Sequence, residues 1–199
     1  VTHNPGKYAI FGVPCFIKAA RLLARQDPRV ADRLKFFIAL FCGQLKTAAF
    51  SEYLSWQCGV KLEDVETIDF RKKYPDRRAD SYGVEITSRS DHSSIDKPMG
   101  HFYDNSWGVG FFKYHACDFC DDVVGETADV SLGDAWLPQY TADSRGTNIV
   151  ISRHPLIQEL IESAMRDGRL VLEAVYGGNV VASQQGGFNP RRLALPYCP

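Results

Sequence analysis

Short apolar runs alternate with stretches of helical periodicity along most of this chain. The runs at residues 8–11 and 36–43 are continuous and predict strands buried in a sheet. Residues 16–25, between them, carry apolar side chains at the spacing of a helix. The same patterns predict helices at 47–57 and 155–167, and strands at 65–71, 83–88, 128–133, 147–151 and 170–173. This order predicts an α/β (mixed α+β) fold, with a mostly parallel or mixed sheet flanked by helices and a cysteine-bearing loop.

Polar and glycine-rich stretches predict the irregular parts of the chain. Asp27-Pro28 ends the first helix, and the polar residues 90–100 predict a mobile loop. From residue 176 onward Gly, Gln, Asn and Pro increase, which predicts a tail over 176–199. No repeat or sharp linker divides the rest, so we expect a single domain over residues 1–175.

The composition excludes several classes of protein. Of the 199 residues, 45% are hydrophobic and 24% are charged, and the net charge is −1, which does not indicate binding to nucleic acid or to an acidic membrane. No apolar run approaches the roughly 18 residues that span a bilayer, and no secretion leader is present. We therefore expect a cytoplasmic protein. Because the chain begins with Val1 and a core strand follows at once, we also expect a fragment whose upstream part is missing.

Two cysteines follow the first two predicted strands. Cys15 lies at a strand-to-helix turn, near the positive end of a helix dipole, where the thiolate form is favoured. Cys42 ends the second apolar run, and ligands collect outside the carboxyl ends of parallel strands. The two thiols could therefore converge on one point. For each alone, a small packing residue is an equally good interpretation.

Two further cysteines form a C-x2-C motif, Cys117 and Cys120, whose thiolates can face one metal or cluster. The absence of a leader and this spacing indicate a reducing compartment rather than a disulfide framework. Cys58 is predicted to be a packing residue on the helix at 47–57, and Cys198 an incidental residue near the end.

Cys15, Cys42, Cys117 and Cys120 together supply four thiolates, which suit either a structural Zn²⁺ or an iron–sulfur cluster. Structural zinc sites more often combine two compact C-x2-C pairs. Here two of the ligands are single and far apart in the chain, which favours a cluster held within a larger fold.

Three other stretches are candidates for binding. Arg71 and Lys72 begin a basic run that is either a solvated turn or a contact for a phosphate-bearing cofactor. Ser131-Leu132-Gly133-Asp134 ends a strand where a ligand could lie, and Gly133 would let the backbone approach a flat ring. The aromatic residues within 102–114 either shield a cofactor or pack in the core.

Five motifs occur in a fixed order along the chain. They are Gly12-Val13-Pro14-Cys15, Phe41-Cys42-Gly43, Phe70-Arg71-Lys72-Lys73, Cys117-Asp118-Phe119-Cys120 and Ala128-Asp129-Val130-Ser131-Leu132-Gly133-Asp134-Ala135-Trp136. Together they resemble the C-terminal domain of the coenzyme F-420 hydrogenase/dehydrogenase beta-subunit family. The resemblance runs from about Tyr8 to about Glu173.

The resemblance implies an iron–sulfur flavoprotein oxidoreductase. Members bind FAD beside a [4Fe–4S] cluster and pass electrons between the cluster, the flavin and a deazaflavin or another two-electron substrate. It further implies a redox partner protein or ferredoxin-like donor and a small-molecule electron acceptor. The four cysteines become the cluster ligands. The residues implied to lie near the cofactor are Ser131, Gly133, Asp134, Thr147, Asn148, Arg71 and Lys72.

The chain is expected to depart from the family in two respects. The family normally has an N-terminal domain before the Gly-x-Pro-Cys turn, and we expect this chain to lack it. The pattern Gly133-Asp134-Ala135-Trp136 with Gly146-Thr147-Asn148 is similar to bacterial members found in surface-polysaccharide settings. The alternative function is a non-catalytic assembly domain, with Zn²⁺ or no metal at the cysteines, that partners polysaccharide-synthesis or oxidoreductase proteins.

Overall fold

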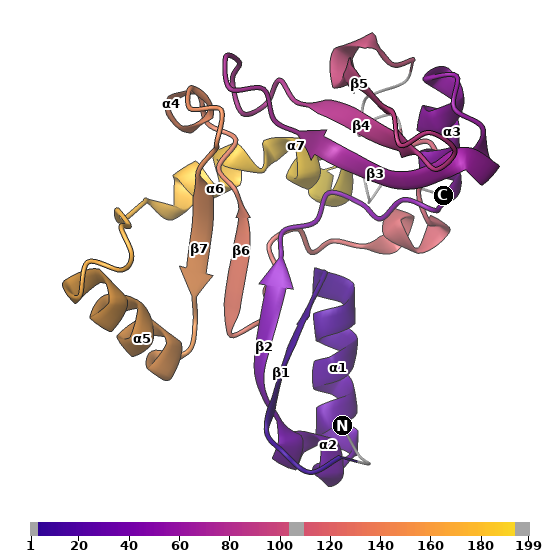
Figure 1. Cartoon of the computed structure of the whole chain (residues 1–199). Coiled ribbons are helices and arrows are strands. Elements are labelled where there is room, and N and C mark those ends of the chain that lie inside the picture. The colour runs from indigo at the N-terminus through magenta and orange to yellow at the C-terminus, as the bar shows by residue number, and fades with distance from the viewer. Residues whose placement is uncertain (1–3, 104–109, 194–199) are drawn as a thin grey trace. The chain divides into compact units, whose positions relative to one another are not determined.

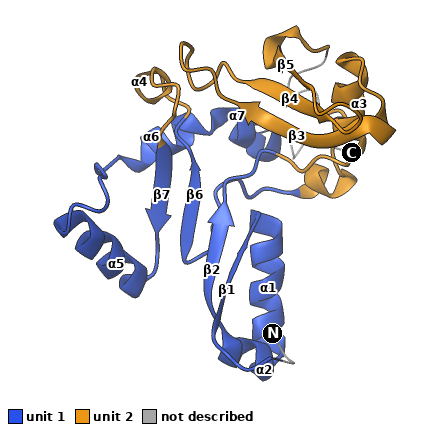
Figure 2. Ribbon diagram, viewed as in Figure 1, with its two compact units in different colours: residues 1–43, 120–135, 148–199 blue, residues 44–119, 136–147 orange. Residues whose placement is uncertain are grey.

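The computed structural model describes residues 4–103 and 110–193, which fall into two compact units (Figure 2). Unit 1 comprises residues 1–43, 120–135 and 148–199, and unit 2 comprises residues 44–119 and 136–147. Each unit is assembled from separate stretches of the chain. No single cut in the sequence would therefore separate them, and the expected single domain over residues 1–175 stays a prediction.

Unit 1 is built on a four-stranded sheet with the order β1-β2-β6-β7 (Figure 1). Its strands are β1 (Tyr8–Gly12), β2 (Leu34–Leu40), β6 (Val130–Asp134) and β7 (Asn148–Ser152). The first three are parallel, and β7 runs antiparallel to β6. The helices are α1 (Pro14–Gln26), α2 (Pro28–Arg33), α5 (Pro155–Arg166), α6 (Gly177–Ser183), α7 (Gln185–Phe188) and the π-helix η4 (Asn189–Leu193). The predicted mixed sheet with flanking helices is confirmed.

Asp27 separates α1 from α2 because it serves both helices. Its backbone N–H donates to the carbonyl of Leu23 at 2.8 Å, and its carboxylate accepts from the backbone N–H of Arg29 at 2.9 Å. Hydrogen bonding with Arg29 lowers the pKa of Asp27 to about 2. Pro28 fills the first position of α2, where no N–H is required. The predicted helix end at Asp27-Pro28 is confirmed.

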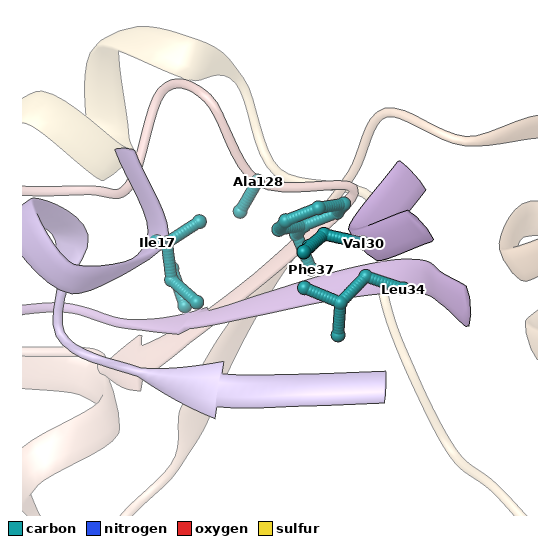
Figure 3. Close-up of a cluster of buried hydrophobic side chains, with 6 residues drawn as sticks. Ile17, Val30, Leu34, Phe37 and Ala128 are labelled. Carbon is teal, nitrogen blue, oxygen red and sulfur yellow. The ribbon is translucent and has the colours of Figure 1, made fainter. Parts of the chain in front are cut away.

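The core of unit 1 lies between α1 and the sheet (Figure 3). Side chains from α1, α2, β2 and the segment before β6 meet there. The buried members are Ile17, Val30, Leu34, Phe37, Ala39 and Ala128. Ile17 and Ala39 are completely shielded from solvent. The strong apolar periodicity of residues 8–40 is thus explained by one cluster that every local element helps to bury.

Asp129 ties the start of β6 to β2 and to α1. Its carboxylate accepts from the backbone N–H of Phe37 at 2.8 Å and from Nη2 of Arg21 at 2.5 Å. The Arg21 guanidinium also lies 4.1 Å from the centroid of the Phe37 ring. Only 12% of the Asp129 side chain is exposed, so this ion pair is shielded far better than a surface pair.

Unit 2 contains a three-stranded antiparallel sheet with the order β3-β4-β5. Its elements are α3 (Ala49–Gln57), η1 (Leu62–Asp64), β3 (Val65–Lys72), β4 (Gly83–Ser88), β5 (Ser94–Pro98), η2 (Met99–His101), η3 (His115–Phe119) and α4 (Pro138–Thr141). Its core is formed by Phe50, Leu54, Val60, Val84, Ile86 and Phe102. Cys58 packs against this core, as predicted, and burial raises the pKa of its thiol. Within the described ranges, no helix combines the length and the apolar character needed to cross a membrane.

The prediction of a loop over residues 90–100 is wrong. Residues 94–98 form β5, which pairs with β4 from Thr87↔Ser94 to Gly83↔Pro98. His92, with φ of 56°, lies in the turn between the two strands. The sequence does not show this strand because its first three side chains are all exposed, so no apolar alternation marks it. Backbone pairing with β4 holds it in place instead.

The second half of the chain also departs from the predictions. Residues 170–173 were expected to form a strand, and in the described structure they have no regular secondary structure, since they have no strand partner. Residues 177–193, within the predicted tail, form α6, α7 and η4. Part of the predicted aromatic stretch, residues 104–109, and Cys198 lie outside the described residues.

Replacing Asp129 by Asn tests the link between β2, β6 and α1. Asp129→Asn removes the negative charge that faces Arg21, and we expect a loss of about 2 kcal/mol in the free energy of unfolding. Asp32→Asn is the matched control, because the Asp32–Lys7 pair is exposed on both sides and should give no measurable change. Urea unfolding followed by circular dichroism would measure both. Equal effects of the two substitutions would contradict the role given to Asp129.

Candidate metal centre

A tight turn over residues 122–126 fixes the segment that carries Cys120. The buried carboxylate of Asp122 accepts from the backbone N–H of Gly125 at 2.7 Å and from that of Glu126 at 3.0 Å. Gly125 has a φ of +69°, and a Cβ at this position would overlap the side chain of Ala39 on β2. The turn therefore requires glycine and lies directly against the core strand.

Cys42 lies on a segment that is bonded to the same turn. Beyond the end of β2, the Phe41 N–H donates to the carbonyl of Leu132 at 2.7 Å, and the Cys42 N–H donates to the carbonyl of Val123 at 2.9 Å. Cys42 and Cys120 are both half-buried. Backbone hydrogen bonds thus hold together two segments that are about eighty residues apart in the sequence.

Arg191 links these two segments through its side chain. Its Nη1 donates to the carbonyl of Asp122 at 2.8 Å and approaches Sγ of Cys120 at 3.4 Å. Its Nη2 donates to the carbonyl of Gly43, the residue after Cys42. Only 6% of Arg191 is exposed. A buried guanidinium therefore spans the segment with Cys42 and the segment with Cys120.

The other two predicted ligands occupy different settings. Cys15 is exposed and is the second residue of α1, so its predicted place at the amino end of a helix is confirmed. Cys117 belongs to η3 in unit 2, where its Sγ accepts from the backbone N–H of Leu45 at 3.4 Å. Its fourth place in the predicted ligand set rests on the C-x2-C spacing.

The residues of unit 1 fit an anionic group bound through cysteine. Thiolates are the preferred protein ligands of iron–sulfur clusters and of structural zinc, and a guanidinium beside Cys120 suits a negatively charged sulfur. In the part of the chain that the structure describes, no three His, Cys, Asp or Glu side chains are grouped closely enough to hold a metal ion. The four-cysteine ligand set therefore stays a prediction.

The predicted flavin contacts on β6 are engaged by the protein itself. Ser131 is completely buried, and its Oγ donates to the carbonyl of Gly125 at 3.1 Å and accepts from Nη1 of Arg153 at 2.9 Å. A Cβ at Gly133 would overlap the ring of Phe41. The flat ring that Gly133 admits is thus that of Phe41, and the residues here do not fit a flavin ring stacked on Gly133.

The other predicted flavin contacts lie at the paired ends of β6 and β7. Asp134 pairs with Asn148 in the ladder, and its carbonyl accepts from Nε2 of Gln184 at 2.6 Å. Asn148 and Thr147 are exposed. The structure brings Asp134 and Asn148 together, while a role for either residue or for Thr147 near a flavin stays a prediction.

Arg71 and Lys72 make contacts within unit 2. Lys72 forms a 2.5 Å ion pair with Glu85, and this hydrogen bond raises the pKa of Lys72. The Arg71 guanidinium lies near two aromatic rings, 4.7 Å from the centroid of Tyr82 and 4.9 Å from that of Trp136. The tryptophan of the Gly133–Trp136 motif thus has a cation–π role. Binding of a phosphate by Arg71 or Lys72 stays a prediction.

Sequence reasoning missed the residues that organise this site. The sequence predicts only loop surface or a turn cap at Asp122, and Arg191 lies in the predicted tail. The pair Asp122 and Gly125 carries a weak signal, because an Asp three residues before a Gly is common in turns. No local pattern marks Arg191, since only the return of the chain end to β2 buries its side chain.

Comparison with known proteins identifies relatives of this chain. Residues 6–176 match the family described as coenzyme F420 hydrogenase/dehydrogenase, C terminus of the beta subunit. A solved structure, titled as the xenon derivatization of the F420-reducing [NiFe] hydrogenase complex from Methanosarcina barkeri, is similar with a TM-score of 0.61 and 17% sequence identity. The similarity covers 96% of this chain and 61% of that chain, and at this identity it shows a shared fold. No curated protein matches the sequence.

Replacing Gly133 by Ala tests the close approach between β6 and Phe41. The new Cβ would displace the ring next to Cys42, and we expect a loss of about 2 kcal/mol in the free energy of unfolding. Gly186→Ala is the control, because no atom outside its own helix neighbourhood lies within 4 Å of a Cβ there. Urea unfolding of both variants would measure the difference. A neutral Gly133→Ala would mean that Phe41 can move away at little cost.

Proposed function

Because this chain belongs to the coenzyme F420 hydrogenase/dehydrogenase beta-subunit family, we propose that it is the C-terminal, cluster-binding part of an iron–sulfur oxidoreductase. The observation that supports this proposal is the arrangement around Cys120. Two cysteine-bearing segments, distant in sequence, are bonded to each other, and a buried cation faces one of the sulfurs. A fold that needed the cysteines only for packing would have no use for that cation.

In this proposal Cys15, Cys42, Cys117 and Cys120 hold a [4Fe–4S] cluster, which supplies one-electron transfer. The chain contributes the positions of the sulfurs. The Asp122–Gly125 turn fixes the segment of Cys120, and the hydrogen bond from Cys42 to Val123 fixes the end of β2. The position of Cys15 at the amino end of α1 stabilises a thiolate there.

The family extends the proposal to a second cofactor and a substrate. Electrons would pass to FAD and to a deazaflavin-like or other two-electron acceptor, with a redox partner protein or ferredoxin-like donor, in the cytoplasm of a bacterium that makes surface polysaccharide. These parts rest on the family resemblance. Since Phe41 occupies the face of Gly133, no flavin contact at that residue forms part of the proposal.

Metal and sulfide analysis of protein purified without oxygen tests the proposal. We expect about four irons and four acid-labile sulfides per chain, with a broad visible absorbance band. One zinc without sulfide would contradict the cluster and favour the alternative, a structural or assembly domain.

Cysteine substitutions locate the site. Cys42→Ala and Cys120→Ala should each abolish most of the iron and sulfide content, because each would remove one of the thiolate ligands. Cys58→Ala is the matched control and should load normally, because Cys58 packs against the core of unit 2. Normal loading of either ligand variant would overturn its assignment, and circular dichroism would confirm that all three variants fold.

A further inference from the structure

Arg191 is a buried cation whose described partners include no carboxylate. Its guanidinium donates to the carbonyls of Asp122 and Gly43 and approaches Sγ of Cys120, and no carboxylate in the described ranges forms an ion pair with it. Burying a charge is costly unless an opposite charge or strong hydrogen bonds compensate. Two neutral carbonyls supply hydrogen bonds but no countercharge. The sulfur of Cys120 is the one partner that can become negative.

The contrast with Arg21 and Arg192 shows what is unusual. The partly buried Arg21 is neutralised by Asp129 at 2.5 Å. Arg192, the next residue, reaches the same 120–126 segment, where it donates to the carbonyl of Asp121 at 3.2 Å and pairs with Glu126. Each of these arginines has a carboxylate partner. Arg191 is more deeply buried than Arg192 and is directed at a cysteine instead.

We propose that Arg191 is a positioning residue of the cysteine site, and that its positive charge balances the negative charge of the group bound through Cys120. This inference rests on the proposed function. The guanidinium would have two effects. Its donation to Gly43 and Asp122 holds the segments of Cys42 and Cys120 at a fixed separation, and its N–H beside Cys120 Sγ stabilises added negative charge.

The inference gives residues 189–193 a function. The π-helix η4 follows α7, and it delivers Arg191 to the carboxyl end of β2 within unit 1. Residues 176–199 were predicted to be a tail, and the family match ends at residue 176. The segment that completes the site therefore comes from beyond the matched region.

Three variants test the role of Arg191. Arg191→Gln removes the charge, Arg191→Lys keeps the charge but replaces the fork of donors by one nitrogen, and Arg192→Gln removes a neighbouring charge that does not contact cysteine. Each whole chain is reconstituted with iron and sulfide without oxygen. Iron and sulfide content, the rate of cluster loss to a chelator and the midpoint potential, by redox titration with electron paramagnetic resonance, are then measured.

We expect the midpoint potential of Arg191→Gln to be more negative than that of the wild type, because reduction adds negative charge beside a site that has lost its cation. We expect Arg192→Gln to keep the wild-type potential. Arg191→Lys should stay close to the wild-type potential and lose its cluster about tenfold faster, because one nitrogen cannot serve the sulfur and both carbonyls. A purely structural role would change cluster loss without shifting the potential.

The outcomes separate this inference from the proposed function. A wild-type chain that takes up no iron and sulfide overturns both. Equal potentials of the wild type and Arg191→Gln, both loaded, overturn the inference and leave the proposed function standing. If circular dichroism shows that Arg191→Gln does not fold, Arg191→Lys decides, and wild-type resistance to the chelator in that variant overturns the inference.

Discussion

The buried carboxylate of Asp122 is the constraint on which the cysteine site depends. It folds residues 122–126 into a turn so tight that Gly125 lies against Ala39 in the core strand β2. Once the turn is in place, the Val123 carbonyl can accept from Cys42, and the Asp122 carbonyl can accept from Arg191. A polar group buried in this way is stable because each bond it makes organises backbone that would otherwise lack a partner.

The two buried networks of unit 1 have different electrostatic characters. Around Asp129, the negative carboxylate and the positive Arg21 neutralise each other, and the Phe37 ring shields them. That network needs nothing further and serves stability. Around Arg191, the protein supplies positive charge without a carboxylate among its described partners, beside a sulfur that can carry negative charge. Charge that is left unbalanced in the fold is a stronger indication of a bound group than the number of cysteines alone.

The carboxyl ends of the parallel strands are used unequally. After β1 the chain turns directly into α1 and presents Cys15, and after β2 it continues along β6 to Cys42. The end of β6 is closed by the chain itself, because Phe41 lies on Gly133 and Gln184 bonds to Asp134. The general tendency of α/β sheets to bind ligands at this edge therefore applies here to the side of β1 and β2.

The sequence by itself determined the elements that local pattern can encode. The strand and helix over residues 8–26, the helix end at Asp27-Pro28 and the placement of Cys15 at a helix start all follow from periodicity and from the chemistry of proline. Tertiary structure decided β5, which polar side chains conceal, and the helices within 177–193. It also decided what Gly133 is for, since only the folded chain shows that its neighbour is Phe41. Arg191 depends on tertiary structure most of all, because the burial and the partners of an arginine are set by segments up to about 150 residues away in the chain.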